Sequence, residues 1–297
     1  MQRTDAFSRC TPAVNFIFFA LAIVLCMFIL HPAYLVVSFL GSALYYLTLK
    51  GRRALKTIAG LLVLLAVLAL LNPVLNTRGA HVLFRWFDRP YTLEAMCYGA
   101  ALGTMFISVL LWFLSYNEVM TSDKFTSLFG NLLPALSLLL VMILRLVPSY
   151  MKKTAQIAGA RRCIGHSVRA AATTKEKVKS GVTILSAMTS WALESSIITS
   201  DSMRSRGYGA AKRVSFRIYR FTVRDGLLLA ATLIPAAVVV AAAVTGQTTA
   251  AFTPRIELAP VGTFSAIGLA AYALFVLIPT LLNLWEAVTW HISISRI

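Results

Sequence analysis

The residues best suited to specific chemistry are arginines at the ends of two predicted helices. Arg206 directly precedes Gly207, and glycine is the usual residue for a left-handed helix stop. Arg161 and Arg162 stand shortly before Gly165 in a similar arrangement. A guanidinium is planar and can engage a carboxylate through two parallel hydrogen bonds. Both helix ends are therefore predicted to dock on an acidic partner; the alternatives are a solvated basic face and simple interaction with the helix dipole.

Motifs for enzymatic chemistry are absent from the sequence. It contains no G-x-x-x-x-G-K-[ST] phosphate loop, no H-E-x-x-H zinc motif and no G-x-S-x-G nucleophile motif. The four cysteines lack metal or redox spacing, and the four histidines are scattered. We therefore predict no catalytic residues, no metal site and no cofactor, and we do not expect an enzyme.

The composition requires lipid as the solvent for much of the chain. The 297 residues are 58% hydrophobic and only 13% charged, whereas soluble domains carry about 25% charged residues. Such a chain cannot cover a globule with polar surface. We predict an all-α, multi-pass helical membrane protein in contact with the lipid bilayer.

About six membrane spans are expected, because each helical span needs roughly 20 apolar residues. Cys10 to Leu49 suits two short spans joined at His31-Pro32, since proline cannot continue a helix without losing a hydrogen bond. We interpret this run as retained, because no small-x-small cleavage site precedes a polar segment. The other predicted spans lie at 57–76, 95–117, 226–246 and 262–284.

The basic residues predict the orientation, because Lys and Arg near span ends stay preferentially cytoplasmic. Between Arg145 and Arg224 lie 16 of the chain's 28 basic residues and only three acidic ones. This stretch is expected to be cytoplasmic, with both termini inside and the protein in the plasma membrane. Attraction to anionic lipid explains part of the net charge of +17, and nucleic-acid binding is not expected so close to lipid.

One apolar segment conflicts with this orientation. Leu132 to Val147 is apolar enough to cross the membrane, but a crossing there would put the basic stretch outside. We predict a helix at the cytoplasmic face or buried against other helices, with Pro134 in its first turn and Pro148 at a boundary or kink. The predicted regions are N-terminal membrane helices at 1–117, long cytoplasmic helices at 118–225 and a membrane hairpin at 226–297.

The segment from Gly181 to Tyr208 has the clearest helical pattern. Ile184, Met188 and Trp191 recur at spacings of four and three residues, which places them on one face of a helix. That face is expected either to contact a partner protein or to pack against neighbouring helices.

The sequence Asp201 to Gly209, D-S-M-R-S-R-G-Y-G, resembles a segment of a known transporter family. It is similar to the A-M-x-x-R-G-Y segment in the transmembrane T component of energy-coupling factor (ECF) transporters, a subclass of the ABC importers. Arg213 and Arg224-Asp225 follow it and resemble the family's basic run ending in Asp. Further resemblance lies at His31-Pro32, Asn72-Pro73, 117–129 and Arg145-Leu-Val-Pro148, so it spans nearly the whole chain.

The resemblance implies that two short x-Arg-x motifs dock into acidic grooves on two ABC-type ATPase subunits. In the family these motifs end two cytoplasmic coupling helices. By position they fall on Ala160-Arg161-Arg162 and Ser205-Arg206-Gly207. Ser205 replaces the usual alanine, and Arg162 replaces a small residue. Arg161 and Arg162 therefore both remain candidates for docking.

The resemblance further implies a small membrane partner, the S component, that captures a vitamin or another micronutrient. ATP hydrolysis would move the coupling helices, and these would transmit the movement to the substrate-binding partner. The face with Ile184, Met188 and Trp191 is the candidate surface for that partner.

Two other functions remain as alternatives. An ordinary ABC permease would need polar residues along its own substrate path, and the predicted spans lack them. A membrane enzyme acting on a phosphorylated lipid could use the basic stretch as its phosphate site. It would need clustered acids or histidines, and the cytoplasmic side offers only scattered ones.

Overall fold

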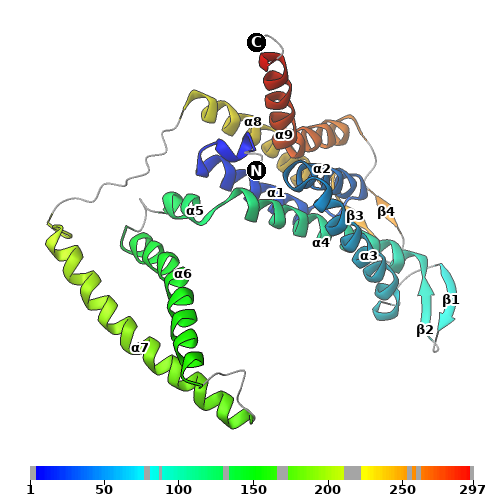
Figure 1. The fold of residues 1–297 in the computed structure, drawn as a ribbon. Helices are drawn as coiled ribbons and strands as arrows, with labels where there is room; N and C mark the ends of the chain where they lie inside the picture. Colours follow the sequence, from blue (N-terminus) through cyan, green and yellow to red (C-terminus); the bar gives the residue numbers. More distant parts are fainter. Residues whose placement is uncertain are drawn as a thin grey trace. The chain divides into compact units, whose positions relative to one another are not determined.

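The chain is mainly helical and divides into two units. The computed structural model describes residues 5–76, 81–86, 89–129, 134–165, 173–210, 222–252, 256–258 and 262–294. One unit, which we name the bundle, comprises residues 1–125 and 219–297. The other unit, which we name the inserted region, comprises residues 126–218. Figure 1 shows the helices of both units.

Apolar helices make up most of the bundle. They are α1 (Pro12–Phe28), α2 (Pro32–Lys50), α3 (Arg52–Leu75), α4 (Leu93–Val119), α8 (Val223–Val244) and α9 (Thr263–Ile294). By length and composition α2, α3, α4, α8 and most of α9 can each cross a membrane, whereas α1 has only 17 residues. The prediction of an all-α, multi-pass helical membrane protein is confirmed, with a helix at each of the six predicted spans.

Consecutive bundle helices run in alternating directions. At one end, Lys50, the last residue of α2, pairs with Glu118 near the end of α4 at 2.5 Å. At the opposite end, Tyr98 near the start of α4 packs against Phe252, with ring centroids 5.7 Å apart. Helices α2 and α4 therefore run in the same direction with α3 running back between them, and α8 runs opposite to α4.

Aromatic side chains form the centre of the bundle. The rings of Phe18 and Phe275 lie 5.0 Å apart, and Phe18 meets Trp112 edge-on at 5.7 Å. Where α2 meets α9, a Cβ added to Gly41 would lie 1.9 Å from Val276 Cγ1. Only glycine allows the two helices to approach so closely. The core therefore joins α1, α4 and α9, while most of α3 stays exposed as expected for a lipid-facing helix.

Two short antiparallel hairpins were not predicted from the sequence. The first pairs β1 (Val82–Trp86) with β2 (Arg89–Thr92), and the second pairs β3 (Ala250–Ala251) with β4 (Glu257–Leu258). Buried Glu94, in the first turn of α4, accepts a hydrogen bond of 3.1 Å from the His81 backbone N–H. The same Oε1 lies 2.7 Å from His81 Nδ1. This contact fixes the start of the first hairpin to α4.

The inserted region contains two long helices. The short helix α5 (Ser122–Phe129) precedes them, and they are α6 (Pro134–Cys163) and α7 (Thr174–Ser205). Pro134 opens α6 as predicted, but Pro148 lies inside the helix and does not end it. The two helices lie close together where α6 ends and α7 begins, and they separate toward their other ends (Figure 1).

Candidate functional site

The end of α7 is a hydrogen-bonded helix stop. Gly207 has a φ of 79°, the left-handed conformation that glycine adopts without a steric penalty. The Tyr208 N–H donates to the Met203 carbonyl at 3.1 Å, and the Gly207 N–H donates to the Arg204 carbonyl at 2.9 Å. These two bonds form a Schellman motif. The predicted glycine stop is confirmed, and it places exposed Arg206 at the last position before the reversal of the chain.

The end of α6 is built in a related way. Gly165 has a φ of 78°, and its N–H donates to the Arg162 carbonyl at 3.1 Å. Arg162 and the preceding Ala160 are exposed. The two ends differ in the spacing between arginine and glycine. Arg206 directly precedes Gly207, whereas Arg162 stands three residues before Gly165.

Arg161 and Arg162 occupy different environments. Arg161 is half-buried, and its Nη2 donates to Ser180 Oγ of α7 at 3.1 Å. Its buried Nε has no hydrogen-bond partner within the described parts of the chain. The side chain of Arg161 therefore belongs to the contact between α6 and α7, whereas Arg162 is the arginine that faces outward.

The face with Ile184, Met188 and Trp191 packs against α6. The Trp191 ring lies 5.5 Å from the Tyr150 ring, and Lys153 Nζ lies 5.5 Å from its centroid. Thr154 Oγ1 lies 3.5 Å from the Met188 sulfur. All three predicted contact residues are half-buried. The sequence left partner contact and helix packing open, and these distances show helix packing; contact with a partner protein stays a prediction.

On the faces that do not take part in the contact between α6 and α7, both helices expose large apolar side chains. On α6 these are Leu139, Val141, Ile143, Leu144, Leu146, Val147 and Met151. On α7 they are Val178, Val182, Leu185, Leu193, Ile197 and Ile198. The exposed set on α6 covers most of the helix surface, and an apolar surface this wide needs lipid or protein against it. The predicted segment 132–147 is therefore helical from Pro134 and requires an apolar environment.

The start of α7 is fixed by two reciprocal hydrogen bonds that were not predicted from the sequence. Thr173 Oγ1 accepts from the Glu176 N–H at 3.3 Å, and the Glu176 carboxylate accepts from the Thr173 N–H at 3.3 Å. This is a capping box, and its T-x-x-E signature could have been found in the sequence. It fixes the start of α7 at Thr174, so the helix has a defined length between its two ends.

The arginine-bearing ends are well separated within the inserted region. Arg161 contacts Ser180, and Arg206 lies 26 residues further along α7. At 1.5 Å per residue this corresponds to about 40 Å. The arrangement can engage acidic groups at two distant points, but it places the two arginines too far apart to act on one small ligand.

Within the described residues, no group of three or more His, Cys, Asp or Glu could hold a metal ion. Ser205 and Gly207 are exposed beside Arg206, and Arg213 lies outside the described residues. No protein-family model matches the chain, and no curated protein matches its sequence.

Proposed function

We propose that this chain is the transmembrane scaffold of an energy-coupling factor transporter. In this proposal two ABC-type ATPases bind the inserted region on the cytoplasmic side of the plasma membrane. A small membrane partner captures a vitamin or another micronutrient. The chain itself performs no chemistry and transmits the movement of the ATPases to that partner.

The observation that carries the proposal is the pair of exposed arginines at rigid, glycine-terminated helix ends. Arg206 and Arg162 are both exposed, and each stands in a last helical turn closed by a left-handed glycine. A separation of about 40 Å is comparable to the diameter of a small domain, so each end suits its own partner subunit. Two ATPase subunits, each with an acidic groove, therefore fit this arrangement better than a single ligand that contacts both helix ends.

Arg162 is the better candidate for docking at the first helix end. Arg161 holds Ser180, and withdrawing it would leave a polar group of the α6–α7 contact without its partner. Arg162 can enter an acidic groove without disturbing that contact. In this proposal Arg161 positions the helix end, and Arg162 together with Arg206 makes the ionic contacts.

The exposed apolar surfaces of α6 and α7 support a membrane-embedded partner. Seven large apolar residues lie exposed on α6 between Leu139 and Met151. Arg145 interrupts them, and a charge at the bilayer centre costs about 3 kcal/mol. We propose that this surface, beside the half-buried Ile184, Met188 and Trp191, contacts the small substrate-binding partner rather than lipid alone.

Photocrosslinking from the helix ends tests the proposal. A photoreactive amino acid replaces Ser205 in one variant and Ala160 in another, both exposed and adjacent to the arginines. We expect crosslinks from both positions to peptides of nucleotide-binding subunits. A matched probe at exposed Ser190, about 15 Å along α7 from Ser180 and about 24 Å before Arg206, should not give these products. Crosslinks to lipid alone from positions 160 and 205 would contradict the proposal.

A further inference from the structure

The N-terminal segment from Asp5 to Thr11 packs into the bundle with Ala6, Phe7, Cys10 and Thr11 buried, although its sequence is largely polar. Phe7 in the short 3-10 helix η1 (Phe7–Arg9) is fully buried. Its ring packs edge-on against Phe18 at 5.2 Å and against Tyr45 at 6.3 Å. One aromatic side chain thus inserts the segment between α1 and α2.

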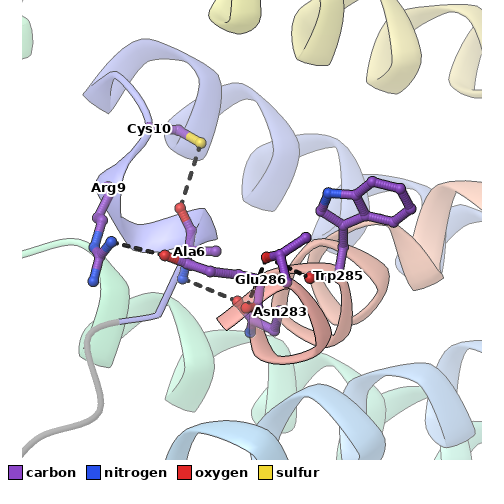
Figure 2. A network of polar contacts seen from close by, with 7 residues as sticks. Ala6, Arg9, Cys10, Asn283, Trp285 and Glu286 are labelled. Atoms are coloured by element: carbon purple, nitrogen blue, oxygen red, sulfur yellow. Dashed lines mark hydrogen bonds and ion pairs between the residues drawn. The ribbon is translucent and has the colours of Figure 1, made fainter. Parts of the chain in front are cut away.

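Polar contacts fasten the same segment to α9. The Ala6 N–H donates to Asn283 Oδ1 at 3.0 Å, and Arg9 Nη1 lies 2.7 Å from Glu286 Oε1 (Figure 2). The ion pair is largely exposed and adds little stability, whereas the hydrogen bond from Ala6 is partly buried. Figure 2 shows both contacts on one face of α9.

The segment also holds the two points at which the chain leaves and re-enters the bundle. Lys124, next to the exit at Phe125, donates from Nζ to the Ser8 carbonyl and, at 3.1 Å, to Ser8 Oγ. The Thr11 N–H donates to Oδ1 of Asp225 in the first turn of α8, at 3.2 Å. Residues 124 and 225 are thus tied to positions three residues apart in the same short segment.

Two ionisable side chains at this contact, Asp5 and Lys124, are half-buried. Burial raises the pKa of Asp5 and lowers the pKa of Lys124, because both charged forms lose hydration. Asp5 Oδ2 accepts from the Tyr45 hydroxyl at 2.6 Å. Buried polar groups that lose their hydrogen-bond partners destabilise a fold, because water cannot replace those bonds. Displacement of the segment would therefore break several contacts together.

We propose that residues 5–11 form a clasp that locks the exit and re-entry points of the inserted region onto the bundle. The clasp makes α5, α8 and α9 respond as one body at this end, so movement of the inserted region reaches the bundle through it. Only this last step, transmission during transport, rests on the proposed function. The clasp itself is a property of the isolated chain.

Thr11→Pro removes one hydrogen-bond donor of the clasp and places the proline Cδ where the donated hydrogen lies, so the Asp225 carboxylate must move away from residue 11. Thr11 has φ −56° and ψ 141°, which proline adopts, and Cys10 is extended as required before proline. The Thr11 carbonyl, which accepts from Val14 and Asn15, is retained. Thr11→Val is the matched control, because it keeps the N–H and the side-chain shape and removes only the buried hydroxyl.

Hydrogen–deuterium exchange on the full-length protein in detergent tests the clasp. We expect Thr11→Pro to accelerate amide exchange at least tenfold in both 119–125 and 222–227, and Thr11→Val to leave both unchanged. Asn283→Leu, which removes the acceptor on α9, should have the same effect as Thr11→Pro if the segment acts as one unit. Acceleration confined to residues 10–15, or equal effects of Thr11→Val and Thr11→Pro, would overturn the proposal.

A parallel pull-down separates the clasp from the proposed function. Thr11→Pro should retain bound ATPases at the wild-type level, because the docking arginines are unchanged. If wild-type protein carries no ATPase, the scaffold function fails while the exchange result still decides the clasp.

Discussion

Charge reversal at Arg162 and Arg206 is expected to abolish stable binding of the ATPase subunits. Loss of one partner from a buried, hydrogen-bonded charge pair costs about 2 kcal/mol or more, which is about 30-fold in affinity for each helix end. With both ends reversed, we expect no detectable complex at micromolar protein. Binding of Arg162→Glu, Arg206→Glu and the double variant would be measured against wild type by affinity pull-down from detergent and by titration.

Arg204→Glu is the matched control for Arg206→Glu. Arg204 is exposed and lies in the same last turn of α7, so both changes have the same effect on net charge. The change at Arg204 should cost only a few tenths of a kcal/mol through the helix dipole. Equal loss of binding in both variants would indicate a general electrostatic effect and would contradict docking through Arg206.

Phe7→Ala is expected to give the largest loss of stability among single changes in the N-terminal segment. Phe7 is fully buried and its ring meets Phe18, Phe19 and Tyr45 edge-on. Phe→Ala changes in cores cost about 3–5 kcal/mol, since they remove aromatic contacts and leave a cavity. The free energy of unfolding would be measured by SDS titration of the protein in mixed micelles.

Phe7→Leu tests whether this loss comes from packing at a buried site. A large aliphatic side chain fills most of the same volume, so the expected cost is about 1.5 kcal/mol or less. A loss below about 1 kcal/mol for Phe7→Ala would show that the segment contributes little to the fold.

The membrane helices could be predicted from the sequence because their signal is local. Apolar runs at 95–117 and 226–246 correspond to α4 (Leu93–Val119) and α8 (Val223–Val244), within about three residues at each end. The helix α9 extends to Ile294, ten residues beyond the predicted span, because the polar residues after Leu284 remain compatible with a helix. Hydropathy marks where lipid begins and ends, which is a different boundary from the end of a helix.

The features that were missed depend on contacts between distant residues. The burial of Phe7 depends on α1 and α2, and the bond from Thr11 to Asp225 joins residues 214 positions apart. Nothing in the local sequence distinguishes this segment from a polar tail. The β1–β2 hairpin was missed for a related reason, since Pro90 and the charged residues around it are typical of a loop.

The candidate site was predicted in part. The glycine stop behind Arg206 is a local signal, and the structure has it at Gly207. The different environments of Arg161 and Arg162 could not be predicted, because they depend on Ser180 of another helix. Helical periodicity placed Ile184, Met188 and Trp191 on one face but could not identify α6 as the surface that this face packs against.

The most direct test of the proposed function is to determine which proteins form a complex with the chain. The wild-type chain would be purified from its native membranes in mild detergent, and its bound subunits identified by mass spectrometry with native mass determination. We predict one chain with two nucleotide-binding ATPase subunits and one small apolar membrane protein. Recovery of the chain without any nucleotide-binding subunit, under conditions in which it remains folded, would contradict a role as an energy-coupling scaffold.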